Sequence, residues 1–229
     1  MIIIPARQES TRLPNKVLLD VCGKPLIWYS IQTALKTKER VIVASDSDEV
    51  LKVCGAWCET FKTPPTNSGT EKVYLAAKTL EPPGGITNQQ ADVPLINEDV
   101  YSPLLNSDSY VSTLYYESSE GKNPNQVKIV GKWDKVHNCE KALYFSRSEI
   151  PHQSHTFKIH IGIYQFFSLS TLQECVNAHN NDFVSENLEQ LHWPYDIQLI
   201  KSPPLFNIDT KEDLEGFRGF VEENSSLWA

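Results

Sequence analysis

The sequence is poor in the positive charge that attracts nucleic acid or anionic lipid. Its 229 residues include 21 Lys and Arg against 29 Asp and Glu, which gives a formal net charge of −8 at pH 7. Such a balance opposes long-range attraction to polyanions, so we expect neither a nucleic acid nor a membrane surface as a partner. Apolar runs are also short, and none approaches the roughly 20 residues that a membrane-spanning helix needs. An anionic small-molecule ligand would have to bind in a local basic pocket.

Cysteine is scarce and does not form a recognisable framework. The five cysteines are an odd number in a chain with no signal-peptide pattern, so we expect reduced thiols and a cytoplasmic protein instead of disulfides. No second pair or His cluster accompanies the closest two to complete a metal site, and buried apolar roles are expected for them. The cysteines are Cys22, Cys54, Cys58, Cys139 and Cys175.

What the sequence does contain is a regular alternation of apolar strands and amphipathic helices. Strands predicted over residues 1–4 and 40–45 flank a helix over 26–36, which is a β-α-β unit. This alternation is typical of an α/β protein with a mainly parallel sheet covered by helices on both faces. The further predicted helices are 48–54, 70–80, 168–178, 183–192 and 211–222, and the further strands are 57–61, 86–90, 110–115, 160–167 and 197–200.

One stretch departs from this alternation. Residues 117–159 are polar, with short β-like pieces at 126–130 and 142–145 and no long helix. We therefore predict a single domain over 1–229 with a small α+β subdomain inserted at about 117–195.

The loop after the first strand concentrates cations. It reads P-A-R-Q-E-S-T-R-L-P-N-K over residues 5–16 and follows the carboxyl end of the strand, where open α/β sheets bind ligands. Cations, small hydroxyl groups and free backbone N–H groups suit a triphosphate. The alternative is an ordinary solvated loop with scattered charges. The side chains concerned are Arg7, Ser10, Thr11, Arg12 and Lys16.

Two aspartates follow apolar stretches. Asp92 comes after the predicted strand 86–90, and Asp209 ends the segment F-N-I-D-T. Both could reach one edge of the sheet, where Mg²⁺ commonly takes one or two carboxylates together with phosphate oxygens and water. On spacing alone, Asp209 with Glu212 at i+3 is better explained as the N-cap of the last helix.

The cation-rich loop resembles the nucleotide-binding loop of CMP-Kdo synthetases, the 3-deoxy-manno-octulosonate cytidylyltransferases. Seven further blocks follow in the family's order across nearly the whole chain, which makes the likeness specific. They are G-K-P-L-I at 23–27, S-G-T-E-K at 68–72, N-P-N-Q-V-K at 123–128, A-L-Y-F-S-R at 142–147, H-I-G-I-Y at 160–164, E-N-L-E-Q-L at 186–191 and I-D-T-K-E-D-L-E at 208–215.

The resemblance implies a Rossmann-like nucleotidyltransferase fold and a Mg²⁺-dependent homodimer. It implies an enzyme that transfers CMP from CTP to an acidic eight-carbon sugar of the Kdo type, with release of pyrophosphate, for lipopolysaccharide or surface-glycan biosynthesis. It reverses the preference for a cap at Asp209 and makes Asp92 and Asp209 metal ligands.

The resemblance also implies roles for individual residues. Implied for catalysis are Arg12, Lys16, Asp92 and Asp209. Implied for nucleotide binding are Pro5, Ala6, Arg7, Ser10, Thr11, Arg12, Lys16, Asn67, Ser68, Gly69, Lys72, Gln90 and Asp92. Implied for the sugar are Gln90, Arg147, His160, Tyr164, Glu189 and Gln190. Taken by themselves, Arg147 and His160 are better explained as a surface arginine and a strand-start histidine with structural roles.

Several positions depart from the family pattern. Ala91 and Val93 flank Asp92 where the family has G-D-E-P, Lys72 stands for an arginine, and Ile159 stands where an arginine is usual. The segment 151–160 is also shorter than the corresponding segment of the family. Two alternatives follow: a cytidylyltransferase for 8-amino-Kdo or another acidic sugar, and a nucleotide-binding homologue with impaired catalysis.

Overall fold

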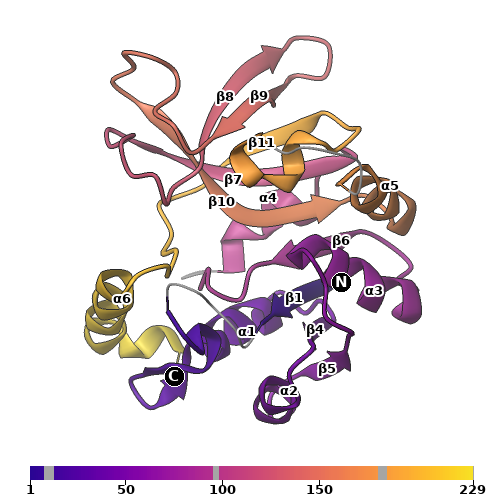
Figure 1. Ribbon diagram of the computed structural model, residues 1–229, viewed down its shortest axis with the longest axis vertical. Helices are drawn as coiled ribbons and strands as arrows, with labels where there is room; N and C mark the ends of the chain where they lie inside the picture. The colour runs from indigo at the N-terminus through magenta and orange to yellow at the C-terminus, as the bar shows by residue number, and fades with distance from the viewer. Residues whose placement is uncertain (8–12, 95–97, 180–184, 229) are drawn as a thin grey trace.

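The computed structural model describes residues 1–7, 13–94, 98–179 and 185–228. Within them, the main element is a nine-stranded sheet with helices on both faces (Figure 1). The predicted α/β class is therefore confirmed. The strands, in the order in which they lie side by side, are β5 (Glu59–Lys62), β4 (Val41–Ser45), β1 (Ile2–Ala6), β6 (Ile86–Gln89), β10 (Phe157–Phe166), β7 (Val111–Ser118), β11 (Ile197–Lys201), β9 (Cys139–Ser146) and β8 (Lys128–Asp134), and a separate pair is β2 (Asp20–Val21) with β3 (Lys24–Pro25).

The sheet has two parts that differ in strand direction. The strands β5, β4, β1 and β6 are all parallel, as the sequence predicts. From β10 onward the sheet is mixed: β10 runs antiparallel to β6 and β7, and β11 is parallel to β7 but antiparallel to β9. The strands β8 and β9 follow each other closely in the chain, and a short connection permits only antiparallel pairing. The predicted parallel sheet thus describes the N-terminal part.

Alternating side chains of the strands build a core on each face of the sheet. In β1, Ile2 and Ile4 pack with α1, α2 and α4, whereas Ile3 packs with α3 and α5. Both faces of β1 and β4 are therefore buried, which explains their continuous apolar sequences. The helices are α1 (Leu26–Lys36), α2 (Asp48–Cys54), α3 (Gly69–Leu80), α4 (Ser102–Leu105), α5 (Leu169–His179) and α6 (Lys211–Glu223), with 3₁₀ turns at Lys16–Leu18, Glu98–Val100, Ser185–Asn187, Glu189–Leu191 and Ser225–Trp228.

One predicted helix is wrong. The sequence pattern predicts a helix over 183–192, but the described part of that segment forms only 3₁₀ turns. Glu186 and Asn187 have positive φ angles of 71° and 51°, and Leu188 is extended. L-residues in the left-handed region cannot continue a right-handed helix, so the chain turns there.

The predicted insertion does not form a sheet of its own. Its strands β8 and β9 extend the nine-stranded sheet beyond β11 and project as a hairpin at the top of the view (Figure 1). The start of β8 also pairs antiparallel with β10. The subdomain boundary at about 117–195 stays a prediction. The hairpin exposes several large apolar side chains, which are Trp133, Val136, Leu143 and Tyr144.

Two expectations from composition can be compared with the structure. In the described ranges, no helix is long and apolar enough to cross a membrane. All five cysteines have free thiols, and burial raises the pKa of both Cys54 and Cys175 to about 12, as for inert buried side chains.

Candidate active site

Three charged side chains from distant parts of the chain meet at the end of the parallel strands. Lys16 begins the first 3₁₀ turn, Asp92 lies in the turn after β6, and Asp209 lies just before α6. The Lys16 Nζ donates hydrogen bonds to the Asp92 carboxylate and, at 3.1 Å, to Asp209 Oδ1. Only 8% of Lys16 and 9% of Asp209 is exposed, so this ion-paired group is largely removed from water.

The main chain brings the two aspartate loops together. The backbone N–H of Ile208 donates to the carbonyl of Asp92 at 3.0 Å, which ties the loop after β6 to the loop before α6. The side-chain amide of Asn207 donates to Asp209 Oδ2 at 3.2 Å. Both oxygens of the Asp209 carboxylate are thus directed by specific donors.

The N-cap of α6 is Thr210, and the interpretation of Asp209 as the cap is wrong. Thr210 and Asp213 form a reciprocal capping box: the Asp213 N–H donates to Thr210 Oγ1 at 3.2 Å, and the Thr210 N–H donates to Asp213 Oδ2 at 2.7 Å. The cap therefore begins one residue later than the spacing suggests. This arrangement leaves the Asp209 carboxylate to face Lys16.

Electrostatics keep this group charged. Burial by itself lowers the pKa of Lys16, but the Asp92 and Asp209 carboxylates outweigh it and raise that pKa above its ordinary value. The ammonium in turn offsets the repulsion between the two carboxylates. Two carboxylates that converge on one cation are also the oxygen donors that Mg²⁺ takes, with phosphate oxygens and water completing its shell. Asp92 and Asp209 therefore fit a divalent ion.

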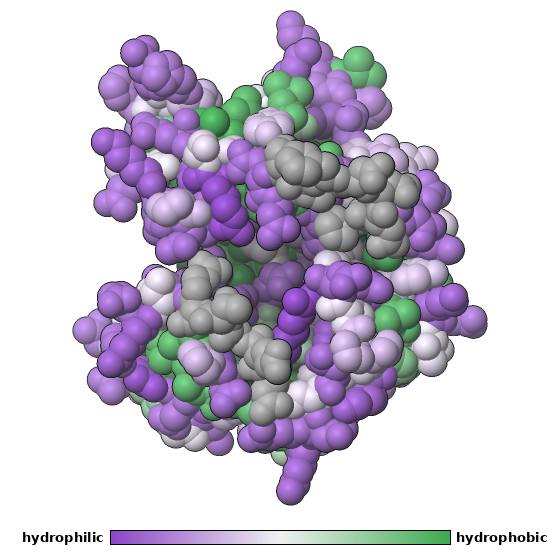
Figure 2. Space-filling view, in the orientation of Figure 1, coloured by the Kyte–Doolittle hydropathy of each residue, from purple (hydrophilic) through white to green (hydrophobic). Residues whose placement is uncertain are grey.

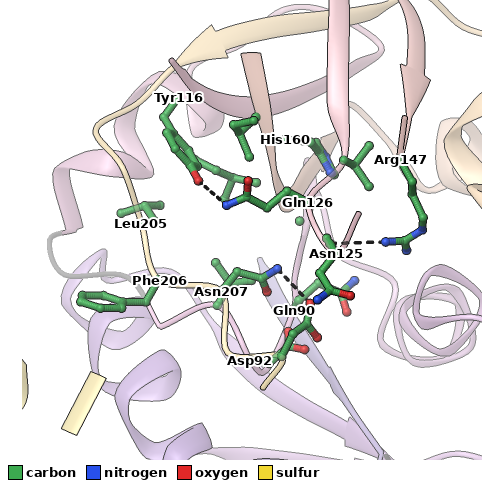
Figure 3. A pocket seen from close by; sticks show the side chains of 16 residues that line it. Gln90, Asp92, Tyr116, Asn125, Gln126, Arg147, His160, Leu205, Phe206 and Asn207 are labelled. Carbon is green, nitrogen blue, oxygen red and sulfur yellow. Dashed lines mark hydrogen bonds between the residues drawn. The ribbon is translucent and has the colours of Figure 1, made fainter. Parts of the chain in front are cut away.

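A cavity of about 180 Å³ opens beside the carboxylates (Figure 3). Asp92, Asp209 and Gln90 line one end, and Arg147 and His160 line the other. It lies where the surface is hollowed between the two parts of the molecule, with hydrophilic side chains around the opening (Figure 2). The structure thus brings together five of the site residues that the sequence predicts.

Gln90 lies beside Asp92 at the carboxylate end of this cavity (Figure 3). A Cβ added to Gly162 would lie 3.0 Å from Gln90 Cγ, and one added to Gly69 would lie 3.3 Å from Gln90 Nε2. Either side chain would crowd Gln90, so glycine on both sides lets it lie between β10 and the start of α3. A Cβ added to Gly69 would also lie 3.6 Å from Pro5 Cγ, so Pro5 lies close to the same point.

His160 is held in its neutral form. Its Nε2 lies 3.0 Å from Thr113 Oγ1, and burial lowers its pKa to about 3. Tyr164 lies behind it, with ring centroids 5.1 Å apart, and also packs against Trp193 at 4.7 Å. The structure therefore places Tyr164 in the core next to His160 and not on the cavity wall.

The segment at the start of α3 is committed to helix capping and an internal ion pair. Ser68 is the N-cap, and its Oγ accepts a hydrogen bond from the Glu71 N–H at 3.0 Å. Asn67 donates its backbone N–H to the Glu71 carboxylate at 2.8 Å. Lys72 is completely buried and forms an ion pair with Asp46. Burial opposes ionisation of Asp46, but the hydrogen bond from Lys72, a backbone hydrogen bond and the charges of Lys72 and Arg7 together outweigh it and lower the pKa of Asp46.

Glu189 and Gln190 lie on a short 3₁₀ turn and not on the amphipathic helix that the sequence predicts. Thr70 Oγ1 donates to Glu189 Oε1 at 2.5 Å, which joins this turn to α3. Gln190 is buried. Neither residue lines the cavity.

The remaining predicted residues belong to the first loop. Pro5 and Ala6 are buried at the end of β1, and Arg7 follows them as an exposed side chain. The predicted phosphate contacts Ser10, Thr11 and Arg12 lie outside the described residues.

Sequence reasoning missed the carboxamides of the site. Asn125, Gln126 and Asn207 line the cavity together with Tyr116, and Tyr116 Oη accepts a hydrogen bond from Gln126 Nε2 at 3.1 Å (Figure 3). The N-P-N-Q-V-K block over 123–128 was the available signal. Neutral amides in a loop carry no charge pattern, so only their position in the fold distinguishes them.

The fold and the site together define an α/β nucleotidyltransferase. A structure of a putative glucose-1-phosphate thymidylyltransferase from Bacillus anthracis, in complex with a sucrose, superposes with a TM-score of 0.71 over 97% of this chain and 95% of that one. At 12% identity this likeness concerns the fold alone.

More particularly, the chain belongs to the cytidylyltransferase family, whose model matches residues 1–220. A 3-deoxy-manno-octulosonate cytidylyltransferase of Brucella ovis is 35% identical over 99% of this chain and 97% of its own length. A structure of CMP:2-keto-3-deoxy-manno-octonic acid synthetase complexed with CTP is 30% identical, with a TM-score of 0.85 over 97% of this chain and 98% of that one.

Proposed function

We propose that this cytidylyltransferase transfers CMP from CTP to an acidic eight-carbon sugar of the Kdo type, releasing pyrophosphate, in lipopolysaccharide or surface-glycan biosynthesis. The observation that carries the proposal is the position of Lys16, Asp92 and Asp209 beside a cavity whose far end bears Arg147. The names of the Brucella ovis relative and of the CTP complex support the same substrates.

In the proposed reaction, the anomeric hydroxyl oxygen of the sugar forms a bond to the α-phosphorus of CTP. The bond from that phosphorus to the pyrophosphate oxygen breaks, pyrophosphate leaves, and the hydroxyl proton passes to solvent water. Such transfers depend mainly on positioning and on neutralisation of phosphate charge. Lys16 and Arg12 would neutralise the triphosphate and the departing pyrophosphate, and we assign no general base.

Asp92 and Asp209 are the proposed ligands of a Mg²⁺ cofactor. When bound, Mg²⁺ supplies positive charge to the phosphate oxygens of the transferred group. Lys16 contacts the same carboxylates in the structure, so it must exchange them for phosphate oxygens when CTP binds.

The proposed nucleotide pocket lies between the first loop and the start of α3. Exposed Arg7 is available to a phosphate or to the base, and the N-terminus of α3 carries Gly69 against Gln90. Ser68 and Lys72 would then act through the shape of this segment, because their side chains are used in the cap and in the pair with Asp46. Asn67 uses its backbone N–H for Glu71, and its side chain is exposed.

The proposed sugar pocket is the opposite end of the cavity. The Arg147 guanidinium is the candidate partner of the sugar carboxylate, because a planar fork binds a carboxylate bidentately. The Nε2 of neutral His160 is paired with Thr113, so Nδ1 is the ring nitrogen that would contact a sugar hydroxyl. Ile159 is buried in the cavity wall, so part of the wall is apolar. This apolar wall is the reason to retain 8-amino-Kdo and other acidic sugars as alternative substrates.

The structure removes one reason to suspect impaired catalysis. Ala91 does not have a positive φ angle, so the glycine expected there is not required by the backbone. Val93 is buried against the core, with 3% of its surface exposed. Neither residue disturbs the direction of Asp92 toward Lys16.

Pyrophosphate release decides between these functions. The purified protein is incubated with CTP and Mg²⁺ and with Kdo, 8-amino-Kdo or N-acetylneuraminate in separate reactions. We expect the fastest release with Kdo. Faster release with another acidic sugar would select the alternative substrate, whereas CTP binding without release with any sugar would select the impaired homologue.

A cytoplasmic homodimer completes the proposal. Five free cysteines suit a reducing compartment. The exposed apolar side chains of the β8–β9 hairpin, including Leu143 at 61% exposure, suit a surface that a second copy covers. Replacing Leu143 by Lys is expected to convert a dimer of the native chain to a monomer in light scattering. Replacing exposed Lys132 by Met on the same hairpin is the control.

A further inference from the structure

A completely buried lysine stands next to the sugar end of the cavity without a role in the proposed reaction. Lys128, the first residue of β8, has no exposed surface. Its Nζ donates to the carbonyl oxygens of Asn123 at 3.0 Å, Gln126 at 2.8 Å and Arg147. An ammonium group has three donors, and here each of them has a backbone acceptor. Such a costly buried group indicates a specific structural task.

The Glu186 carboxylate binds the main chain of Arg147 on the side opposite to Lys128. The backbone N–H of Arg147 donates to Glu186 Oε2 at 2.9 Å, and the hydroxyl of the preceding Ser146 donates to Glu186 Oε1. Glu186 comes from the 3₁₀ turn that replaces the predicted helix, and its positive φ of 71° places it there. These hydrogen bonds, first that of Ser146 and then that of Arg147, lower the pKa of Glu186.

The guanidinium of Arg147 contacts the loop over 123–126, whose carbonyl oxygens also bind Lys128. Arg147 Nη1 donates to the carbonyls of Asn125 at 3.3 Å and Pro124 at 3.4 Å, and Figure 3 shows the first of these contacts. The side chains of Asn125 and Gln126 line the cavity beside it. Lys128 therefore fixes both the carbonyl of Arg147 and the loop on which the guanidinium lies.

We propose that Lys128 and Glu186 are positioning residues that fix the main chain of Arg147 from its carbonyl and its N–H, and thereby set the direction of its guanidinium at the sugar end of the cavity. The inference rests on the proposed role of Arg147 toward the sugar carboxylate. Neither residue touches the nucleotide side of the cavity, so their loss affects the sugar and spares CTP.

The kinetic test separates the two substrates. Lys128→Met keeps the length of the side chain and removes its donors, and Glu186→Gln keeps the shape and removes the charge. We expect Lys128→Met to raise sugar KM about tenfold. CTP KM should stay within about twofold of wild type. Glu186→Gln should act in the same direction and more weakly. Lys132→Met, on the exposed part of the same strand, should leave both constants unchanged.

A double-mutant cycle distinguishes positioning from general damage. If Lys128 acts through Arg147, Lys128→Met should add less than about a twofold change in sugar KM when Arg147 is already Ala. An unreduced effect in that background, or an equal rise in CTP KM, would overturn the inference. If Lys128→Met does not fold, the same cycle with Glu186→Gln decides the question.

A second readout does not depend on turnover. The chain has only five arginines, so the side-chain Nε–Hε signal of Arg147 can be assigned in an NMR spectrum from its loss in Arg147→Lys. We expect Lys128→Met and Glu186→Gln to shift or broaden this signal, while the signal of Arg40, which pairs with Glu59 elsewhere, stays unchanged. An unchanged Arg147 signal in both variants overturns positioning. If wild type used no acidic sugar, the proposed function would fail while this measurement still decided the geometry.

Discussion

The two ends of the cavity are built by different physical means. At the carboxylate end, the Lys16 ammonium lies between the carboxylates of Asp92 and Asp209 and offsets one of their two negative charges. At the sugar end, neutral carboxamides and His160 surround a single arginine, and the supporting bonds run to backbone groups. The carboxylate end depends on attraction between charged side chains, whereas the sugar end depends on the path of a loop.

This difference predicts how each end responds to substitution. Removing a carboxylate from the carboxylate end removes a proposed metal ligand, and removing Lys16 removes a cation that can neutralise phosphate. Removing a donor from the sugar end changes where Arg147 points and leaves the phosphate chemistry in place. The variants below test this contrast, from the largest expected effect to the smallest.

Asp92→Asn and Asp209→Asn should each lower kcat at least 100-fold. Loss of one charged metal ligand should cost several kcal/mol, on the order of 3 kcal/mol, of transition-state stabilisation. Steady-state pyrophosphate release and Mn²⁺ binding, measured by electron paramagnetic resonance, both report it.

The matched control is the cap beside Asp209. Thr210→Ala removes the capping hydroxyl and should cost about 1 kcal/mol of folding free energy, with kcat within about twofold of wild type. A normal kcat in Asp209→Asn together with a lowered Tm would show that Asp209 serves the fold and not the reaction.

Lys16→Met should raise CTP KM about tenfold or more and leave sugar KM nearly unchanged at saturating CTP. Each charge-assisted hydrogen bond to a phosphate is worth roughly 1.5 to 3 kcal/mol. The same variant should bind Mn²⁺ several-fold more tightly without nucleotide, because the competing ammonium between Asp92 and Asp209 is gone. A rise in sugar KM alone would contradict the contrast between the two ends.

Arg147→Lys should raise sugar KM about tenfold, or roughly 1.4 kcal/mol, because lysine keeps the charge and loses the fork. CTP affinity should not change, and separate titrations of the two substrates measure this. Arg40→Lys, in an exposed pair with Glu59 away from the cavity, is the control. An unchanged sugar KM would assign Arg147 to the fold and leave the carboxylate without an identified partner.

The smallest effect concerns acid stability at His160. Burial lowers its folded-state pKa to about 3, whereas the unfolded side chain titrates near 6.5. The unfolded state therefore gains a proton first, so His160 lowers the stability of the fold as pH falls from about 6.5 toward 3.

The urea concentration at the midpoint of unfolding falls between pH 7 and pH 5, and this fall should be smaller in His160→Gln than in wild type. His152→Gln, at an exposed position, should not reduce the fall. Equal acid sensitivity in wild type and His160→Gln would mean that the buried imidazole is not a source of acid lability.

Local sequence was sufficient for the parallel part of the molecule. The predicted helices over 26–36 and 48–54 have the observed bounds of α1 and α2, and the strand predicted at 86–90 is β6 at Ile86–Gln89. Apolar spacing and caps are properties of neighbouring residues, so they can be found without the fold. The same local reasoning failed over 183–192, because the left-handed Glu186 is stabilised by contacts with Ser146 and Arg147 from another strand.

The sequence by itself determined the α/β class, the family blocks and the identity of Lys16, Asp92, Asp209 and Arg147 as candidates. Only the tertiary structure decided that Lys16 lies between the two carboxylates, that Thr210 is the cap, and that Tyr164 stands behind His160. The physical reason is separation along the chain: Lys16 meets residues 76 and 193 positions away. Periodicity describes which face of an element is buried, whereas strand order and loop packing decide which distant side chains share a site.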